Sequence, residues 1–335
     1  MIRIVSFCMV LLSPSLTMSA EPSRVLVDTA GRRVSTPSTV KHVATIGAVP
    51  VLDSFLLALG EAGTIVNGVP GFTQTKRHKY LRLLAPAVFT QPITQGPAGD
   101  PNIELLKTLH PDLFLVIDAS LADRLEELRI PCVVLTGQTP EDVQKSISLL
   151  GEIFGKQARA AEYQRWMDTA RSRIKLVLGT NPDQERPRVL FLSLKQMGRM
   201  HQTIDWWITE AGGINVAENG KGERERAYSS EQVSQWNPDV LVVNNAAEIE
   251  QVYADSRFTE LQAVKRKRVY TVPVGIHFWH RSVEQPLMLL WAAKTLTPER
   301  FKMIDLETET KAFYKEFFNY DLSSDQVAEI LSGVQ

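Results

Sequence analysis

The chain has 335 residues, of which 44% are hydrophobic and 22% are charged, and its formal net charge is −1. These values are ordinary for a globular protein of about two domains. The near-neutral charge gives no global field of the kind that attracts nucleic acid. After the first twenty residues, no segment reaches the roughly 18 uninterrupted apolar residues that mark a transmembrane helix. Composition and charge therefore argue against nucleic-acid binding and against a chain that crosses the membrane repeatedly.

The first twenty residues have the pattern of a secretory signal peptide. Arg3 supplies a positive start, the segment from Ile4 to Leu12 is apolar but too short to span a bilayer, and small residues lead to a cleavage site after Ala20. We therefore predict export with removal of residues 1–20. Removal takes away one positive charge, Arg3, and changes the net charge from −1 to −2.

The next part of the chain, residues 21–139, predicts an α/β lobe. Residues 27–34 read as a hairpin, and residues 43–46 as a strand that ends in a small-residue turn at Gly47. Residues 113–117 form an apolar run of the kind found in strands covered on both faces. We expect this lobe to contain a mostly parallel sheet.

Residues 140–179 predict a helical segment. Thr139 with Asp142 three residues later is a capping pair, and Pro140 stands at the first helical position. The pattern breaks at Gly155. It then continues with apolar residues in steps of three and four, at positions 163, 166, 167, 170, 174 and 177, so one face is buried. A polar stretch, residues 180–187, ends the segment and marks a boundary.

Two segments far apart in the chain have the same construction. Residues 102–116 and 229–243 each contain a glutamate as the third residue, Glu104 or Glu231. A short helix, a Pro-Asp pair and an apolar strand follow in both segments. The Pro-Asp pair supplies a turn in both copies. After the second copy come a strand at 269–273 and an amphipathic helix near 285–296. The sequence thus predicts a second α/β lobe, residues 180–335, built like the first.

This order of elements resembles the class III periplasmic solute-binding proteins of ABC importers, a family that serves iron–siderophore complexes, haem and cobalamin. The resemblance covers residues 24–331. It implies two Rossmann-like α/β lobes with mostly parallel central sheets, joined by a single long α-helix, with the ligand cleft between them. It also implies a periplasmic monomer without a cofactor that passes its ligand to a permease dimer in the inner membrane.

The resemblance predicts the class of ligand but not its identity. A metal chelate is expected, with a ferric siderophore first because it is the family's commonest cargo. Haem, cobalamin, a nickel chelate and an oxyanion such as molybdate remain alternatives. An exported hydrolase is a different function, but the sequence has neither a Gly-x-Ser-x-Gly elbow nor a glycine-rich phosphate loop. We therefore predict a binding protein and not an enzyme.

The strongest candidate for a ligand-binding loop is the segment from 275 to 282. His277, Trp279, His280 and Arg281 crowd within it, and a helix is expected to begin just after it. Ligands bind outside the carboxyl ends of strands in open α/β sheets, and aromatic faces with guanidinium groups suit a flat anionic chelate. For Trp279, packing between lobe and helix is the alternative; for Arg281, it is a local cap or ion pair.

Other candidates for ligand contact lie elsewhere in the chain. The first lobe offers Phe72, Lys76 and Arg77, and the second offers Arg199. A basic run such as the one at 76–79 also fits an exposed, solvated loop.

Direct metal binding needs more ligands than one loop supplies. His277 and His280 are three residues apart and could chelate a metal, but zinc takes three or four protein ligands. The further ligands would have to be His78 or His201, which lie elsewhere in the sequence. We therefore expect no direct metal site and a metal that arrives as a chelate.

Glu104 and Glu231 occupy the positions of the family's permease-docking glutamates. The resemblance implies that each meets arginines of one permease subunit, and such charge pairing suits a reversible contact that sets orientation. The alternative is that they stabilise their helices through the helix dipole, by about 0.3–1 kcal/mol each. Asn102 and Ser229 or Ser230 fit as the N-caps of these helices.

Overall fold

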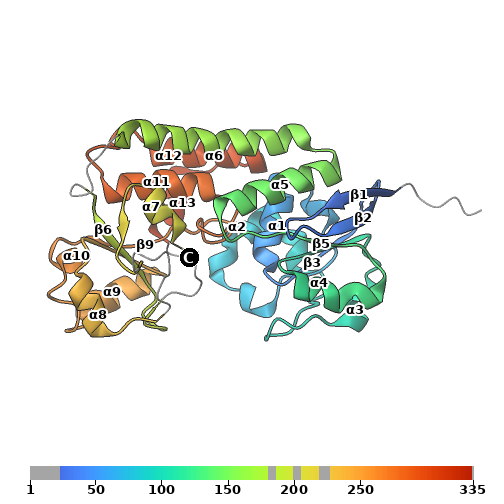
Figure 1. Cartoon of the computed structure of the whole chain (residues 1–335), viewed down its shortest axis with the longest axis horizontal. Coiled ribbons are helices and arrows are strands. Elements are labelled where there is room, and N and C mark those ends of the chain that lie inside the picture. Colours follow the sequence, from blue (N-terminus) through green and yellow to red (C-terminus); the bar gives the residue numbers. More distant parts are fainter. Residues whose placement is uncertain (1–22, 180–185, 199–204, 219–226, 334–335) are drawn as a thin grey trace, which may run out of the picture.

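The structure is a computed structural model that describes residues 23–179, 186–198, 205–218 and 227–333. Two α/β lobes lie side by side, and long helices run along both of them (Figure 1). One lobe contains a three-stranded sheet of order β3-β4-β5, and the other a four-stranded sheet of order β7-β6-β8-β9. All neighbouring strands in these two sheets are parallel. The predicted fold class is therefore confirmed.

The first lobe begins with the predicted hairpin, in which β1 and β2 pair antiparallel. Every residue of its three parallel strands is buried, as expected for a sheet with helices on both faces. The strands are β1 (Ser23–Val27), β2 (Arg33–Pro37), β3 (Val43–Ile46), β4 (Leu113–Val116) and β5 (Cys132–Val134). The helices are α1 (Val49–Ala58), α2 (Lys79–Leu84), α3 (Ile103–Thr108) and α4 (Ala119–Leu125), with 3₁₀ turns at Ala62–Thr64, Gly71–Thr73, Lys76–His78, Pro86–Phe89 and Glu126–Leu128.

The second lobe follows the sequence prediction closely. The apolar strand predicted after Pro-Asp in residues 229–243 covers 240–243, and the helix predicted near 285–296 has these bounds, whereas the strand predicted to reach Pro273 ends at Thr271. Proline has no N–H to donate to a sheet. The strands are β6 (Arg188–Leu192), β7 (Ile214–Asn215), β8 (Val240–Val243) and β9 (Val269–Thr271), and the helices are α7 (Trp206–Glu210), α8 (Ser230–Trp236), α9 (Ala246–Ala254), α10 (Gln262–Lys265) and α11 (Gln285–Leu296).

Two consecutive helices, α5 (Pro140–Phe154) and α6 (Gln157–Leu178), connect the lobes. Thr139 and Asp142 form the predicted capping box, and α5 ends at Gly155, whose φ of 67° is left-handed and suits glycine. Helix α6 spans 22 residues, or about 33 Å at 1.5 Å per residue. It packs against α5 and α11 and runs along both lobes (Figure 1).

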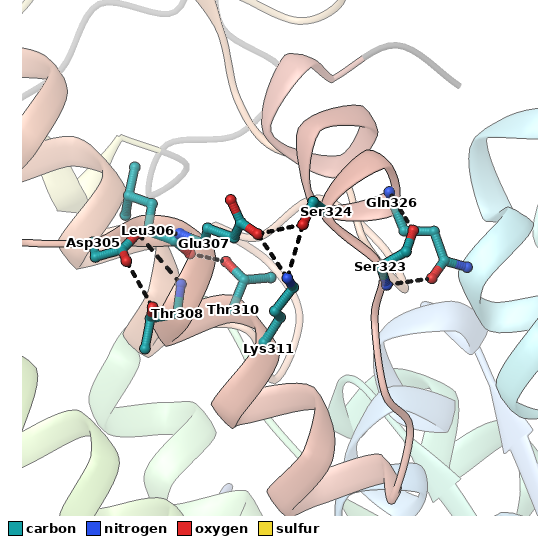
Figure 2. A network of polar contacts seen from close by, with 9 residues as sticks. All are labelled: Asp305, Leu306, Glu307, Thr308, Thr310, Lys311, Ser323, Ser324 and Gln326. Carbon is teal, nitrogen blue, oxygen red and sulfur yellow. Dashed lines mark hydrogen bonds and ion pairs between the residues drawn. The ribbon is translucent and has the colours of Figure 1, made fainter.

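The last two helices, α12 (Leu306–Phe318) and α13 (Ser324–Ser332), return to the first lobe. The Tyr80 hydroxyl donates to the Gln326 carbonyl at 3.1 Å, and Lys79 Nζ lies 2.6 Å from Glu329 Oε2. Figure 2 shows the polar network that joins α12 to α13, in which Lys311 Nζ contacts both Glu307 and Ser324. The lobes are therefore held together by α13 as well as by α6.

One cluster of buried apolar side chains extends through both lobes, and each lobe has a further cluster of its own. The shared cluster includes Val43 and Leu113 from the first sheet and Val189 and Val240 from the second. Helices α1, α6 and α11 contribute side chains to the same cluster. No helix within the described residues is long and apolar enough to span a bilayer.

Candidate ligand-binding cleft

A pocket of about 640 Å³ opens between the two lobes. Two arginines and two histidines line it, Arg77 and His78 from the first lobe and His277 and Arg281 from the second. No carboxylate is among the described residues that line the pocket. Its apolar wall consists of Ala48, Pro50, Val51, Phe72, Ile117 and Phe278, and the remaining lining residues are Gly47, Thr73 and Thr75. The pocket therefore combines positive charge with apolar surface.

The turn after β3 brings the start of α1 to this pocket. Gly47 has a φ of 95°, and a Cβ there would lie 2.7 Å from Ile117 Cγ1, so only glycine fits. The Gln95 side chain fixes the turn, donating to the Gly47 carbonyl at 3.0 Å and accepting from its amide at 2.8 Å. No side chain caps α1. Its N-terminal end, which favours negative charge, is thus presented beside the pocket.

His78 and His277 meet across the cleft. His78 Nε2 lies 3.2 Å from His277 Nδ1, and the two rings are nearly parallel, at 14°. Burial is the main cause that lowers the pKa of His78 to about 4 and the pKa of His277 well below its ordinary value, and nearby Arg77 and Arg281 act in the same direction. Both imidazoles are therefore neutral at neutral pH, and one donates a hydrogen bond to the other.

The two arginines of the pocket come from opposite lobes. Arg77 Cζ lies 5.0 Å from the centroid of the Phe278 ring, a cation–π contact across the cleft. Burial lowers the pKa of Arg281. Within the described parts of the chain, neither guanidinium forms an ion pair with a carboxylate. The arrangement can therefore accept negative charge from a ligand without first breaking an ion pair to a described residue.

Two residues predicted to contact the ligand lie outside the pocket. Trp279 is fully buried, and its Nε1 donates to Glu284 Oε1 at 3.0 Å. His280 is 2% exposed and packs against the rings of Phe191 and Phe278. The Trp279 side chain packs in the interior, which is the alternative to ligand contact that the sequence left open. The sequence left His277 and His280 open as a possible metal-binding pair, with His78 or His201 as a further ligand; in the structure, the nitrogen that lies 3.2 Å from His277 Nδ1 is Nε2 of His78.

The other predicted ligand contacts differ in where they lie relative to the pocket. Phe72, Arg77, His277 and Arg281 all line the pocket. Lys76 belongs to the 3₁₀ turn beside Arg77, while Arg199 and His201 lie outside the described residues. Within the described ranges, no three His, Cys, Asp or Glu side chains form a group that could hold a metal ion.

Several residues that line the pocket are not among the predicted ligand contacts. Phe278 is one of them, although it stands between two residues that were chosen. His78, which belongs to the basic run at 76–79 and was also named as a possible metal ligand, lines the pocket. Ile117, which follows β4, had a signal in its position at a strand end. The signal for these residues was therefore their position in a cleft loop or at a strand end, and residue type alone was not decisive, because Trp279 and His280 do not line the pocket.

Glu104 and Glu231 lie on exposed first turns of α3 and α8. The Glu104 side chain is 84% exposed and pairs with Lys107 at 2.9 Å. Hydrogen bonds from its own backbone amide and from Ser229 lower the pKa of Glu231. Other residues cap the helices, since Asn102 accepts from the third amide of α3 and Ser229 forms a capping box in α8. Both helices lie on the side of the molecule opposite α6 (Figure 1).

The chain belongs to the periplasmic binding protein family, because the sequence model of that family matches residues 52–274. MolA of Haemophilus influenzae, a molybdate-binding protein, is 25% identical over 97% of this chain and 99% of its own. Its molybdate-bound structure aligns with a TM-score of 0.78 at 22% identity, covering 90% of this chain and 99% of MolA.

Two further solved structures have the same fold. A periplasmic solute-binding protein of Veillonella parvula aligns with a TM-score of 0.80 at 26% identity, over 92% of this chain and 97% of its own. CeuE of Helicobacter pylori, in a nickel–histidine complex, aligns with a TM-score of 0.73 at 17% identity, over 92% and 99%. The chain is thus the periplasmic solute-binding component of an ABC importer. Such proteins bind a solute without a cofactor and are not enzymes.

Proposed function

We propose that the cleft captures an anionic metal chelate, with a ferric siderophore as the first candidate. The observation that carries this proposal is the pair of arginines, Arg77 and Arg281, which approach the pocket from opposite lobes with no carboxylate among its described lining residues. Arginine pairs with carboxylates and similar oxygen groups through two hydrogen bonds. A volume of about 640 Å³ lies within the range of sites that bury a drug-sized ligand.

Molybdate is the second candidate. The supporting observation is the similarity to MolA, a molybdate-binding protein, over almost the whole of both chains. An oxyanion would use the same arginines and the open N-terminus of α1, but it would leave the apolar wall formed by Phe72 and Phe278 largely without contact. The apolar wall therefore favours the larger chelate.

A titration with a panel of ligands tests the proposal. The purified chain from residue 21 to residue 335 is titrated with ferric catecholate and hydroxamate siderophores, haem, cobalamin, nickel–histidine, molybdate and, as a control oxyanion, sulfate. We expect sub-micromolar binding of one anionic chelate. Tight binding of molybdate alone selects the second candidate, and failure of every anionic probe to bind contradicts both.

Substitution of Arg281 locates the site. Loss of a charge-assisted hydrogen bond costs about 1.5–3 kcal/mol, so we expect Arg281→Ala to weaken anion binding by about 10- to 100-fold. The matched control is Arg165→Ala on α6, because Arg165 forms a surface pair with Glu162 away from the pocket. Equal affinities for the two variants contradict a role of Arg281 in the cleft.

We propose that Glu104 and Glu231 dock the protein onto the arginines of an ABC permease dimer. Their exposure, and the capping of their helices by other residues, support this role. The double variant Glu104→Arg with Glu231→Arg should abolish ligand-stimulated ATP hydrolysis by the reconstituted importer while ligand affinity stays unchanged. Glu299→Arg, at an exposed site, serves as the control and should leave hydrolysis intact.

The chain's maturation and division into domains are also proposals. We propose that residues 1–20 are a signal peptide removed after Ala20, and that the mature chain divides into 21–139, 140–179 and 180–335. Mass determination of the protein from a periplasmic extract tests the cleavage, because any other N-terminus than Glu21 contradicts it. The contacts of α13 with Lys79 and Tyr80 support lobes that move little relative to one another.

A further inference from the structure

The loop that forms the second-lobe wall of the cleft surrounds one buried carboxylate. Glu284 stands directly before α11 and is completely buried. Its side chain does not cap that helix. It turns back toward the loop from Gly275 to Ser282, the segment that carries His277 and Arg281. Glu284 itself does not line the pocket, so any effect on a ligand acts through these neighbours.

Four residues of the loop donate hydrogen bonds to this carboxylate. The Ile276 amide lies 3.1 Å from Oε2 and 3.2 Å from Oε1, and the His277 amide lies 3.5 Å from Oε2. The Ser282 hydroxyl donates to Oε2 at 2.8 Å, and Trp279 Nε1 donates to Oε1 at 3.0 Å. The donors come from both ends and the middle of the loop, so one side chain ties the whole segment together.

A fifth donor and one glycine complete the enclosure. The Tyr314 hydroxyl, from α12, donates to Glu284 Oε1. A Cβ on Gly275 would lie 1.8 Å from Glu284 Oε1 and 2.1 Å from the Tyr314 oxygen, so only glycine allows the backbone to pass this close. Burial raises the pKa of Glu284 to about 7, and the hydrogen bonds from Tyr314 and Ser282 oppose that shift. Five donors around one buried carboxylate provide the partners that a desolvated charge requires.

We propose that Glu284 is a positioning residue of the cleft, whose carboxylate fixes the loop backbone so that His277 and Arg281 are presented to the ligand. The His277 amide is held by Glu284 while its imidazole reaches His78 across the cleft. Arg281 lies between two residues that are tied to the same carboxylate, Trp279 and Ser282. The part of this inference that concerns ligand affinity rests on the proposed function.

The substitution Glu284→Gln removes the carboxylate but keeps the size of the side chain, so it tests the effect of the carboxylate alone. A glutamine has one acceptor oxygen, and its amide nitrogen is a donor, which would face groups that also donate. The matched control is Asp28→Asn. Asp28 is likewise buried and accepts from the amides of Ala30, Arg32 and Val134 at 3.1, 2.8 and 3.1 Å, but it does not line the pocket.

The first measurement is hydrogen exchange of the unliganded protein, read by mass spectrometry. We expect Glu284→Gln to speed exchange in residues 275–282 by about tenfold or more, since a buried acceptor for the Ile276 and His277 amides is lost. Asp28→Asn should leave this segment unchanged. If Glu284→Gln does not fold, Ser282→Ala removes one donor and should give a smaller change in the same direction. Unchanged exchange in the folded variant overturns the inference.

The second measurement is affinity for a ferric siderophore and for molybdate. We expect Glu284→Gln to weaken the probe that the wild type binds by about tenfold, with no change for Asp28→Asn. A loosened loop with unchanged affinity overturns the positioning role. If the wild type binds neither probe, affinity is measured for whichever ligand of the panel it binds. If it binds none of them, the proposed function fails, and the exchange measurement alone still decides whether Glu284 holds the loop.

Discussion

The two walls of the cleft are built in different ways. The first-lobe wall includes two 3₁₀ turns, Gly71–Thr73 and Lys76–His78, in which Phe72 is 59% exposed and Arg77 is exposed. The second-lobe wall is the loop from Gly275 to Ser282, most of which is buried around Glu284. Local turns present Phe72 and Arg77 at the surface of the first wall, and buried polar contacts fix the second wall. The second wall should therefore be far more sensitive to substitution.

The largest expected difference between the two walls is in the unfolding free energy that is lost when an aromatic residue is removed. Trp279→Ala removes a fully buried indole and one donor to Glu284, and should cost about 3–5 kcal/mol of unfolding free energy. Phe72→Ala, at an exposed side chain, should change stability by no more than about 0.5 kcal/mol. Urea denaturation of both variants measures this. Similar losses for the two would mean that the walls do not differ in packing.

Two glycines sharpen the same comparison. Gly275→Ala places a methyl group against Glu284 and Tyr314 and should cost about 3 kcal/mol, the upper end of the usual range for overpacking. Around Gly71 nothing lies within 4 Å of the added Cβ, so Gly71→Ala should be neutral or slightly stabilising. Thermal melts of the two variants provide the measurement. A Gly275→Ala protein as stable as the wild type would show that the loop adjusts freely.

Asp53 is a buried acid of α1, the helix that begins at the first wall, and it makes stability depend on pH. Burial raises the pKa of Asp53 from 3.8 to about 7, and the hydrogen bond from the Thr45 hydroxyl at 2.7 Å opposes this. A raised pKa means that the folded state binds the proton more tightly than the unfolded state. The stability that the proton provides is therefore present below pH 3.8 and is lost as the pH rises toward 7.

Asp53→Asn removes this pH dependence. From pH 5 to pH 8 we expect the wild type to lose on the order of 2 kcal/mol of unfolding free energy through Asp53, and the variant to lose less by that amount. Urea denaturation at both pH values measures the difference. If the two proteins lose stability in parallel, Asp53 does not titrate in this range, and Glu284, whose pKa is also raised to about 7, becomes the candidate.

Most elements of the fold could be predicted because their signals are local. The strand at 240–243, the helix at 285–296 and the break at Gly155 depend on apolar periodicity, on capping residues and on a glycine, all within a few residues of one another. The two Glu-to-Pro-Asp segments revealed the repeated construction of the lobes for the same reason. Each ends in a buried strand of a parallel sheet.

The candidate site was predictable only as a set of loops. Residues 70–78 and 275–282 do face each other, but their composition did not decide which side chains enter the space between them. Trp279 and His280 have the chemistry of ligand contacts but are buried and do not line the pocket, whereas Phe278 and His78 line it.

The sequence by itself determined the two α/β lobes, the helical connection, the family and the loops that contain the cleft, because short-range patterns of side chains carry that information. Only the tertiary structure decided the His78–His277 contact, the approach of Arg77 and Arg281 to one pocket from opposite lobes, and the hydrogen bonds around Glu284. Those features depend on groups brought together from distant parts of the chain, such as Tyr314 of α12 against a loop that ends at Ser282. A buried carboxylate is held by whichever donors the packed helices bring to it, and no local pattern records that choice.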